Sequence, residues 1–483
     1  MTAEVKQMII GGVFALAKSG ESFPVIAPAD GRVIATVALA SAEDANAAVE
    51  QAREGFELWA ALAPGERERI LLRAAEIIEA EGESRFLDNL IDEGGCTIVK
   101  ARGEIGYSAD LLRTAAGESR RLYGDTFPND NPERISMVFR EPLGVVAVIS
   151  PYNAPLALLT KMSAFPLAAG NAIVIKPSEE TPLTALAFGQ LMLDAGLPPA
   201  CISVITGMGA QCGAALSANP TVDCIALTGS SATGRLVGAE SVQHMRRCQL
   251  ELGGKSALLV LRDADPVKAA AIAAQGIFNH AGQICMANSR VVVDRAIYQP
   301  FVTALKAASE AIVYGELRDE NSQFGPLINQ TAVDKVLSHV RDAVAGGAEL
   351  LTGGNADGLV VEPTVLLEPA RDSTAWCEES FGPVVSVVAA EGLEEAIAIA
   401  NDSQYGLSAA VLTHNVQWGF RAARGIKAGS VHIGMHAFQS NAMAPIGGYK
   451  MSGIGRSGGK YSTEEFTELK WVSVSLEDDG ADG

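Results

Sequence analysis

Hydrophobic and polar positions in the first part of the chain predict short strands followed by long helices. Two strand-like runs lie between residues 23 and 40. Ser41 and Asp44 then form a capping box, after which apolar positions recur at helical spacing as far as Trp59. A second helix is expected from about residue 66 to 80, just after Pro64.

From Gly144 onwards the pattern changes to short runs that are apolar throughout. Helix-length segments such as 184–195 alternate with these runs. Strands without a polar face are buried on both sides, which is typical of a parallel, doubly wound sheet. The runs are GVVAVIS, AIVIKP, ISVITG and CIALTG.

A second region of the same kind begins near Ser256 with SALLVL, so the predicted fold class is α/β with two doubly wound parallel sheets. Its helices are expected at residues 266–278, 299–311 and 332–345.

The remaining segments are predicted from their turn residues and their alternation. Glycine-rich stretches at 346–358 and 447–459 are expected to be loops. The run WVSVSL at 471–476 alternates like a strand, and the final EDDGADG, residues 477–483, should be frayed.

The apolar segment MIIGGVFALA, residues 8–17, permits two interpretations. It could be the hydrophobic region of a secretory signal, with Ala15, Leu16 and Ala17 as a cleavage site. Alternatively, Gly11 and Gly12 could form the turn of a hairpin. The glycine pair and the weakly basic flank containing Glu4 favour the hairpin. No apolar run in the sequence approaches the roughly 18 residues needed to span a bilayer.

Composition narrows the function classes. With 483 residues, 48% of them hydrophobic, the chain can bury large cores in two or three domains. Its 57 acidic and 37 basic residues give a net charge of −20, which argues against nucleic acid and membrane surfaces as partners. The seven cysteines form neither a CxxC pair nor a metal-like cluster, so we expect no metal and a cytoplasmic protein with reduced thiols.

Two side chains are candidates for catalysis. Cys285 lies in GQICMANSR, where two preceding polar or flexible residues suggest a loop that presents the thiol to a cavity. The alternatives are a buried structural cysteine, or a Cys-His hydrolase that uses His280. Glu251 lies in LELGGKS, where a carboxylate at a strand edge suits a general base or, alternatively, a bond to a nearby turn.

Two further segments could hold a phosphorylated ligand. GSSATG, from Gly229 to Gly234, follows a predicted strand and opens a helix, where backbone N–H groups can meet a pyrophosphate. Lys176 and Glu179 stand just beyond another strand, where ligands bind in open α/β sheets. Each segment could instead be a plain turn or a solvated loop.

Taken together, eight motifs resemble those of the aldehyde dehydrogenase superfamily, in the family's order and over nearly the whole chain. They are SPYNAPL, IKPSEETP, LTGSSATGR, LELGGKS, GQICMANSR, EESFGPV, NDSQYGLSAAV and GGYKMSGIGR. The resemblance implies that Cys285 attacks the aldehyde, that Asn153 and the Cys285 N–H form the oxyanion hole, and that Glu251 activates the water that hydrolyses the thioester.

The same resemblance implies NAD as the cofactor. Lys176 and Glu179 would contact the adenosine ribose, and Glu179 would repel the 2′-phosphate of NADP. Ser230 would meet the pyrophosphate. The implied cofactor residues are Pro151, Tyr152, Lys176, Ser178, Glu179, Gly229, Ser230, Thr233, Leu252, Glu379 and Phe381.

Family architecture would divide the chain into three parts. It implies a dinucleotide-binding domain at 1–123 and 143–254, a catalytic domain at 255–455, and a β oligomerisation arm at 124–142 and 456–483. The strand at 471–476 would pair with a second subunit, giving a homodimer or homotetramer.

Departures from common family residues concern the aldehyde pocket. Tyr152, Ala154 and Ile446 replace a frequent Trp, Phe and Phe, which predicts a wide pocket for an aromatic or otherwise bulky aldehyde. Lys161 resembles the basic residue of salicylaldehyde-type members, and it either binds a polar substituent, reaches solvent or pairs with a carboxylate. Lys460 stands where a glutamate near the tunnel mouth is frequent. The implied pocket residues are Ala154, Lys161, Ile284, Met286, Phe438 and Ile446.

Three other functions remain open at this point: a semialdehyde dehydrogenase, a CoA-acylating aldehyde dehydrogenase, and a non-catalytic binding or structural member. The presence of Glu251 favours water over CoA as the acyl acceptor. The presence of Cys285, Glu251 and Asn153 argues against a non-catalytic member.

Overall fold

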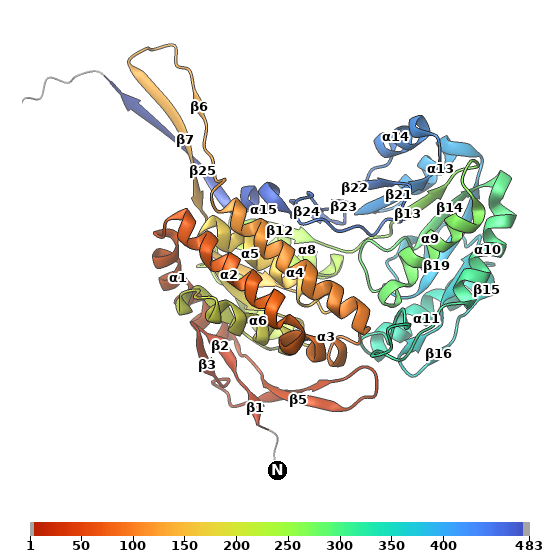
Figure 1. Ribbon diagram of the computed structural model, residues 1–483, viewed down its shortest axis with the longest axis horizontal. Helices are drawn as coiled ribbons and strands as arrows, with labels where there is room; N and C mark the ends of the chain where they lie inside the picture. The colour runs from red at the N-terminus through yellow and green to blue at the C-terminus, as the bar shows by residue number, and fades with distance from the viewer. Residues whose placement is uncertain (1–3, 477–483) are drawn as a thin grey trace, which may run out of the picture.

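The computed structural model describes residues 4–476, so the predicted fraying of residues 477–483 lies outside the described part of the chain. Two large sheets, each covered by helices, form the two halves of the molecule, and a long narrow β arm projects from the first half (Figure 1). The predicted fold class, α/β with two doubly wound parallel sheets, is confirmed.

The first sheet has eight strands in the order β24-β12-β11-β8-β9-β10-β2-β3. The five strands from β12 to β10 run parallel, and β24 and β2 join them antiparallel at the two sides. The strands are β2 (Met8–Ile10), β3 (Val13–Ala15), β8 (Val145–Ile149), β9 (Ala172–Lys176), β10 (Ile202–Val204), β11 (Cys224–Thr228), β12 (Arg247–Glu251) and β24 (Gly453–Ile454).

Helices cover both faces of this sheet, which explains its apolar strands. Every residue of β9 and β11 is buried, as the continuous apolar runs predict. The helices are α1 (Ala42–Ala60), α2 (Pro64–Gly82), α3 (Asp88–Asp92), α4 (Ile98–Glu118), α5 (Ala157–Ala169), α6 (Pro182–Asp194), α7 (Ala214–Ala218) and α8 (Ser231–Gln243). A small sheet of β1 (Val5–Lys6), β4 (Ser22–Ile26) and β5 (Val33–Ala38) lies beside them.

The second sheet has seven strands in the order β15-β18-β19-β14-β13-β21-β22, all parallel except β15. Its strands are β13 (Ala257–Val260), β14 (Arg290–Asp294), β15 (Glu349–Thr352), β18 (Thr364–Leu367), β19 (Val384–Ala390), β21 (Ser408–Leu412) and β22 (Ser430–Ile433). Its helices are α9 (Pro266–Phe278), α10 (Tyr298–Glu310), α11 (Gln330–Ala345), α12 (Thr374–Cys377), α13 (Gly392–Asn401) and α14 (Val416–Gly425).

The arm is a three-stranded antiparallel sheet made from two distant parts of the chain. Strand β7 (Arg134–Pro142) lies between β6 (Thr126–Phe127) and β25 (Thr467–Ser475), which follows α15 (Gly459–Glu465). Because β25 is an edge strand, one row of its backbone groups faces away from the sheet.

Several local predictions are confirmed. Gly11 and Gly12, with φ of 56° and 74°, form the turn between β2 and β3, so the hairpin interpretation of residues 8–17 is correct. The capping box at Ser41 is present, with the Ser41 N–H donating to Asp44 Oδ2 over 2.8 Å. The helices expected at 184–195, 266–278, 299–311 and 332–345 correspond to α6, α9, α10 and α11.

Two predicted loops contain strands and are corrected. Segment 346–358 includes β15 and β16 (Ala356–Asp357), which pairs with β17 (Val360–Val361). Segment 447–459 includes β23 (Tyr449–Lys450), which pairs with β20 (Tyr405–Gly406), and β24, which pairs with β12. Glycine marks the bends between these strands, but distant partners decide where the backbone becomes extended.

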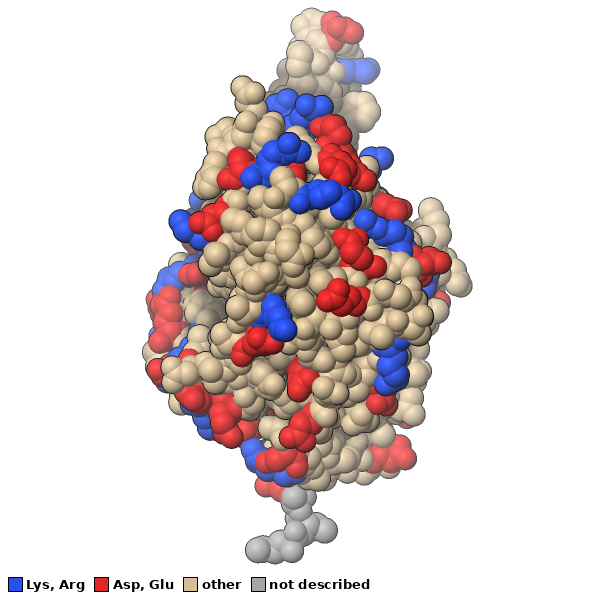
Figure 2. All heavy atoms as spheres, turned by 90° about the vertical axis from the view of Figure 1, so that its right-hand side faces the viewer, with Lys and Arg blue, Asp and Glu red and all other residues tan. Residues whose placement is uncertain are grey.

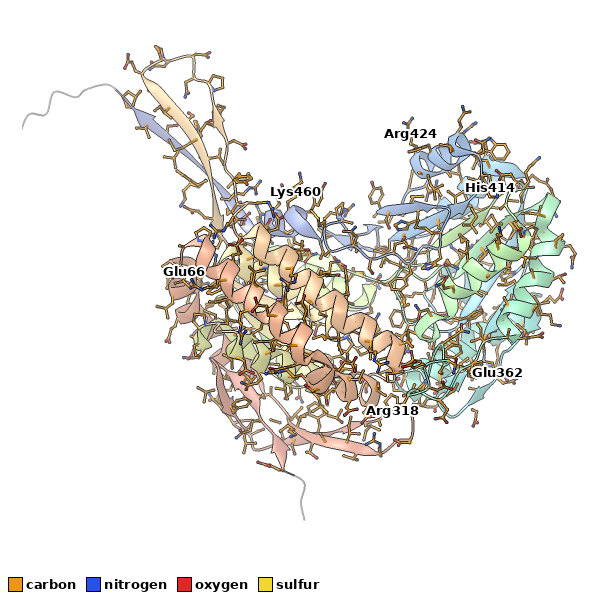
Figure 3. The ribbon with its side chains drawn as sticks, in the orientation of Figure 1. Glu66, Arg318, Glu362, His414, Arg424 and Lys460 are labelled. Carbon is orange, nitrogen blue, oxygen red and sulfur yellow. The ribbon has the colours of Figure 1, made fainter. Side chains whose placement is uncertain are left out.

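Charged side chains are distributed over both halves. Figure 2 shows acidic and basic side chains interspersed over one face of the molecule. Arg318 lies where the second half meets α3 (Figure 3), and its guanidinium bonds Asp88 over 2.8 Å and Asp92 over 3.3 Å. Among residues 4–476, no helix is long and apolar enough to cross a membrane. All seven cysteines are free thiols.

Candidate active site

The carboxyl ends of four parallel strands meet at one edge of the first sheet. Ile149 of β8 lies opposite Lys176 of β9 and Leu227 of β11, and Thr228 lies opposite Glu251 of β12. The segments that follow these strands carry most of the predicted cofactor and catalytic residues. This edge is the crevice where ligands bind in doubly wound sheets.

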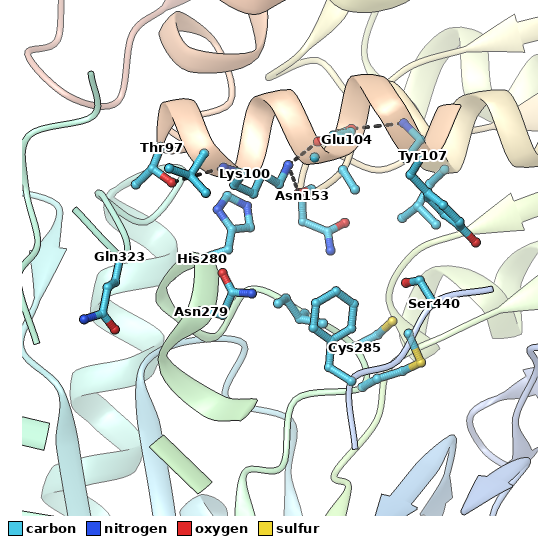
Figure 4. Close-up of a pocket in the computed structure, with 18 of the residues that line it drawn as sticks. Thr97, Lys100, Glu104, Tyr107, Asn153, Asn279, His280, Cys285, Gln323 and Ser440 are labelled. Carbon is cyan, nitrogen blue, oxygen red and sulfur yellow. Dashed lines mark hydrogen bonds and ion pairs between the residues drawn. The ribbon is translucent and has the colours of Figure 1, made fainter. Parts of the chain in front are cut away.

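A cavity of about 600 Å³ adjoins this edge, between the two halves of the molecule. Most of the exposed surface of its wall is apolar, and its residues come mainly from α4, α5 and three loops of the second half (Figure 4). All nine residues predicted for catalysis and for the aldehyde pocket line it: Asn153, Ala154, Lys161, Glu251, Ile284, Cys285, Met286, Phe438 and Ile446.

A short left-handed turn positions Cys285 at the wall of this cavity. His280, Ala281 and Gly282 have φ of 50°, 53° and 70°, which only glycine adopts without strain. A Cβ on Gly282 would lie 2.2 Å from the Gly382 carbonyl oxygen, so this turn is also closely packed. Burial and the carboxylates of Glu379 and Glu251 raise the pKa of the Cys285 thiol to about 12.

The turn does not create a Cys-His pair. Burial and the Lys100 ammonium lower the pKa of His280 well below its usual value, so its imidazole stays neutral. Its Nε2 has no hydrogen-bond partner among residues 4–476. The geometry therefore gives no support to the hydrolase alternative, in which His280 would activate Cys285.

Asn153 follows β8 and reaches the cysteine loop. Its Nδ2 donates to the carbonyl oxygen of Gln283 over 2.8 Å, two residues before Cys285. Gln283 is itself fixed, since its Oε1 accepts from the Ile328 N–H over 3.0 Å. An amide nitrogen has two hydrogens, so Asn153 keeps one N–H for another acceptor.

Glu251 ends β12 and is paired inside the cavity wall. Its Oε1 accepts from Lys161 Nζ over 3.4 Å and from Gln249 Nε2 over 3.3 Å. The Lys161 and Glu251 side chains are only 3% and 9% exposed. Of the three alternatives for Lys161, the structure therefore shows the pairing with a carboxylate. That carboxylate belongs to Glu251, the predicted general base.

The crevice beside the cavity has the parts needed to hold a dinucleotide. Lys176 Nζ lies 3.1 Å from Glu179 Oε2 at the end of β9, and the Glu179 side chain is 43% exposed. Ser230 caps α8 by accepting from the Thr233 N–H over 3.1 Å. Gly229 donates its N–H to the Glu251 carbonyl over 3.0 Å. This bond connects the turn predicted to bind the pyrophosphate to β12, which carries the predicted general base.

A network of contacts fixes three further residues of the predicted cofactor site, Tyr152, Glu379 and Phe381. Glu379 Oε1 accepts from the Gly254 N–H over 2.9 Å, and the Tyr152 and Phe381 rings meet edge to face at 6.0 Å. Between Glu379 and Phe381, the Ser380 hydroxyl bonds Lys255 Nζ over 3.3 Å and His339 Nδ1 over 3.1 Å.

The other predicted cofactor residues lie at the same edge. Pro151 lies two residues after the end of β8. The Ser178 hydroxyl, after β9, accepts from the Glu180 N–H over 3.3 Å. Leu252 packs beneath α8, since a Cβ on Gly234 would lie 2.4 Å from its methyl groups.

Comparison with known proteins shows which family this chain resembles. The sequence profile of the Aldehyde dehydrogenase family matches residues 14–472. A vanillin dehydrogenase of Pseudomonas fluorescens is 39% identical over 473 residues, which cover 97% of each chain. The chain belongs to the aldehyde dehydrogenase family. It is therefore an oxidoreductase enzyme.

Other members of the family differ in the substrates in their names. The mitochondrial succinate-semialdehyde dehydrogenase of Arabidopsis thaliana is 38% identical over 473 residues, which cover 97% of this aldehyde dehydrogenase and 89% of that one. A solved NAD-dependent aldehyde dehydrogenase of Sinorhizobium meliloti superposes with a TM-score of 0.96 at 36% identity, covering 99% of this chain and 96% of that one.

Sequence reasoning missed the contribution of α4 to this aldehyde dehydrogenase. Lys100, Glu104 and Tyr107 of α4 line the cavity. The helix could have been found from its buried positions Leu111, Leu112, Ala115 and Ala116, which follow helical spacing, and from its N-cap Thr97.

Lys460, expected near the tunnel mouth, is exposed at the start of α15 (Figure 3). It is not among the residues that line the cavity. Its ammonium lies 5.2 Å from the centre of the Tyr461 ring.

Proposed function

We propose that this enzyme uses NAD to oxidise uncharged, bulky aldehydes, most favourably aromatic ones, to carboxylic acids. The observation that carries this proposal is the single cavity whose wall holds a thiol, a carboxylate and an asparagine, next to a dinucleotide-type crevice. These are the groups that covalent aldehyde oxidation requires.

In the proposed reaction, the Cys285 thiolate adds to the aldehyde carbon and gives a thiohemiacetal. The free N–H of Asn153 and the Cys285 backbone N–H stabilise its oxyanion. NAD, held by Glu179 and the first turn of α8, would supply the acceptor for the hydride that leaves the thiohemiacetal carbon, so that a thioester would remain on Cys285. Glu251 then removes a proton from water, the water attacks the thioester carbon, and the acid leaves with the thiolate restored.

The crevice residues fit NAD by their chemistry. The Glu179 carboxylate is exposed at the end of β9, where it can accept bonds from two ribose hydroxyls and would repel a 2′-phosphate. Ser230 and the first turn of α8 offer N–H groups to a pyrophosphate. The NAD-dependent relative from Sinorhizobium meliloti supports the same cofactor.

The charges of the cavity support an uncharged substrate. Both lysines in its wall already have a carboxylate partner: Lys100 pairs with Glu104, and Lys161 pairs with Glu251. A third carboxylate, Glu320, pairs with Arg102 outside the wall over 2.8 Å. No lysine of the wall is therefore left to balance a distal carboxylate, whereas the apolar side chains suit a ring.

The relatives support this substrate class only in part. The vanillin dehydrogenase acts on an aromatic aldehyde, as its name says, and the Arabidopsis relative is named for a semialdehyde. A semialdehyde dehydrogenase is the second candidate function. Lys161 could bind the distal carboxylate of a semialdehyde only if it released Glu251.

The test is the rate of NADH formation with a panel of aldehydes: benzaldehyde, 4-hydroxybenzaldehyde, acetaldehyde, propanal and succinic semialdehyde. We expect kcat/KM for the aromatic aldehydes to exceed that for acetaldehyde by about tenfold or more, since a ring buries more apolar surface than a methyl group does. Cys285→Ala should form no NADH.

Other outcomes identify the alternatives. A preference for the semialdehyde, or for the small aliphatic aldehydes, would overturn the proposed substrate class. Appearance of acyl-CoA when CoA is added would identify a CoA-acylating enzyme. Absence of NADH with every aldehyde would favour the non-catalytic alternative.

We further propose that the three parts of the chain have the roles implied by the family: dinucleotide binding by 1–123 and 143–254, catalysis by 255–455, and subunit contact by the arm at 124–142 and 456–483. The edge strand β25 supports a homodimer or homotetramer, because an unpaired edge can continue into a second subunit. The free cysteines support a cytoplasmic location.

A further inference from the structure

Two charged residues of α4 hold the backbone around Asn153. Lys100 Nζ donates to the Asn153 carbonyl oxygen over 2.9 Å. Glu104 Oε1 accepts from the N–H groups of Leu156 over 2.8 Å and Ala157 over 3.0 Å. The two side chains also bond each other through Lys100 Nζ and Glu104 Oε2 (Figure 4).

Glu104 replaces a cap that the sequence of α5 lacks. Leu156, the residue before the helix, makes no side-chain capping bond. The first N–H groups of a helix have no partner within it, and a carboxylate there satisfies them and opposes the positive end of the helix dipole. The Glu104 side chain is only 3% exposed, so its carboxylate is largely shielded from water.

Lys100 fixes the other side of the same turn. Its bond to the Asn153 carbonyl holds the peptide that follows the asparagine, while Asn153 Nδ2 is held by the Gln283 carbonyl. Burial opposes the charge of Lys100, but the Glu104 carboxylate outweighs this and raises the pKa of the ammonium. The Lys100 ammonium therefore stays charged at neutral pH.

These contacts bear on the reaction through Asn153. Oxyanion stabilisation depends on donors that are already in place when charge develops, and small displacements of such a donor are costly. Three bonds from one ion pair define the segment from Asn153 to Ala157. Among residues 4–476, no other ion-paired side chain is hydrogen-bonded to this segment.

We propose that Lys100 and Glu104 are positioning residues of the oxyanion hole, acting on the reaction through Asn153. The inference rests on the proposed roles of Cys285 and Asn153. It adds that an ion pair on a separate helix keeps the Asn153 amide directed at the oxyanion site.

The test compares Lys100→Met, Lys100→Arg, Asn153→Ala and the double variant Lys100→Met/Asn153→Ala. The first assay is release of 4-nitrophenolate from 4-nitrophenyl acetate, in which the Cys285 sulfur bonds the acyl carbon, nitrophenolate leaves, and water then releases acetate. This assay needs the thiol and the oxyanion hole but neither NAD nor the correct aldehyde. Failure of the proposed aldehyde oxidation is thus distinguishable from failure of this inference.

We expect Lys100→Met to lower the acylation rate 10- to 100-fold, in the range seen when a catalytic donor is displaced or removed. Lys100→Arg should restore most of the rate. The double variant should be no slower than Asn153→Ala, because Lys100 has nothing to position once the amide is gone. The double variant Lys100→Met/Glu104→Gln leaves no unpaired buried charge. Its acylation rate should be as low as that of Lys100→Met.

Two controls separate positioning from general damage. Lys306→Met breaks an equally spaced pair with Glu310 on the exposed face of α10 and should keep the wild-type rate. Alkylation of Cys285 by iodoacetamide forms no oxyanion, so Lys100→Met should leave that rate within about twofold. Additive losses in the double variant, or an equal loss in alkylation, would overturn the proposal.

Discussion

The seven cysteines of the chain differ in what surrounds each sulfur. Burial raises the pKa of Cys96 and of Cys201 to about 12, and both thiols bond backbone carbonyls inside the first half. Cys285 has an equally raised pKa, but its sulfur faces a cavity with Asn153 and Glu251 in the wall. Reactivity here depends on access and on neighbouring groups as well as on the thiol pKa.

The raised pKa of Cys285 predicts how its reactivity changes with pH. Because the thiol pKa is near 12, the thiolate fraction should rise about tenfold per pH unit from pH 7 to pH 10. The rate of Cys285 alkylation by iodoacetamide, followed by peptide mass spectrometry, should rise in proportion. Saturating NAD should increase the rate at fixed pH, since a positive ring nearby favours the thiolate. A rate that levels off below pH 8 without NAD would contradict this prediction.

The sequence predicted which residues line the cavity better than it predicted the contacts between them. Motifs identified Cys285, Glu251, Asn153 and Lys161, and the structure brings all four to one cavity. The pairing of Lys161 with Glu251 was one of several open alternatives, because it depends on how α5 is oriented against β12. Such an orientation is a property of packing between elements that are distant in sequence.

At the scale of elements, the left-handed turn at 280–282 and the end of β12 bring Cys285 and Glu251 to the wall of one cavity. Periodic patterns predicted the long helices and buried strands, because these patterns record which face is covered. Strands such as β24 were missed, since its two residues become extended only by pairing with Leu250 and Glu251.

Two neighbouring substitutions should separate the conformation of the turn from its chemistry. Gly282→Ala places a Cβ 2.2 Å from the Gly382 carbonyl oxygen at a φ of 70°, so it should destabilise the fold by about 3 kcal/mol and reduce kcat more than tenfold. Ala281→Gly, at a φ of 53°, relieves strain and should stay within about 1 kcal/mol of the wild type. Denaturation midpoints and kcat measure both effects, and similar behaviour of the two variants would refute this account of the turn.

At the scale of the molecule, the arm exposes an apolar surface far from the cavity. Its exposed apolar side chains include Phe127, Ile135, Phe139, Leu469 and Trp471, and Trp471 is 67% exposed. The Phe127 and Trp471 rings lie 6.3 Å apart on one face of the arm. A surface of this kind, next to an edge strand, is typical of a subunit contact.

Trp471→Glu should therefore weaken the assembly. We expect sedimentation analysis to show a wild-type dimer or tetramer that dissociates towards monomer in the variant, because a charge replaces a large apolar contact. Val416→Glu, at a position that is 68% exposed on α14 in the second half, is the matched control and should leave the assembly unchanged. A monomeric wild-type protein would contradict the proposed role of the arm.

In the mechanism that we propose, Cys285 forms a thioester and Glu251-activated water hydrolyses it. The most direct measurement is rapid mixing of Glu251→Gln with NAD and the best aldehyde, followed by mass analysis of the quenched protein. We predict a burst close to one NADH per active site, an acyl group on Cys285, and steady turnover about 10²- to 10⁴-fold below the wild type. Turnover at the wild-type rate, or a slow variant with neither burst nor acylated Cys285, would contradict the mechanism.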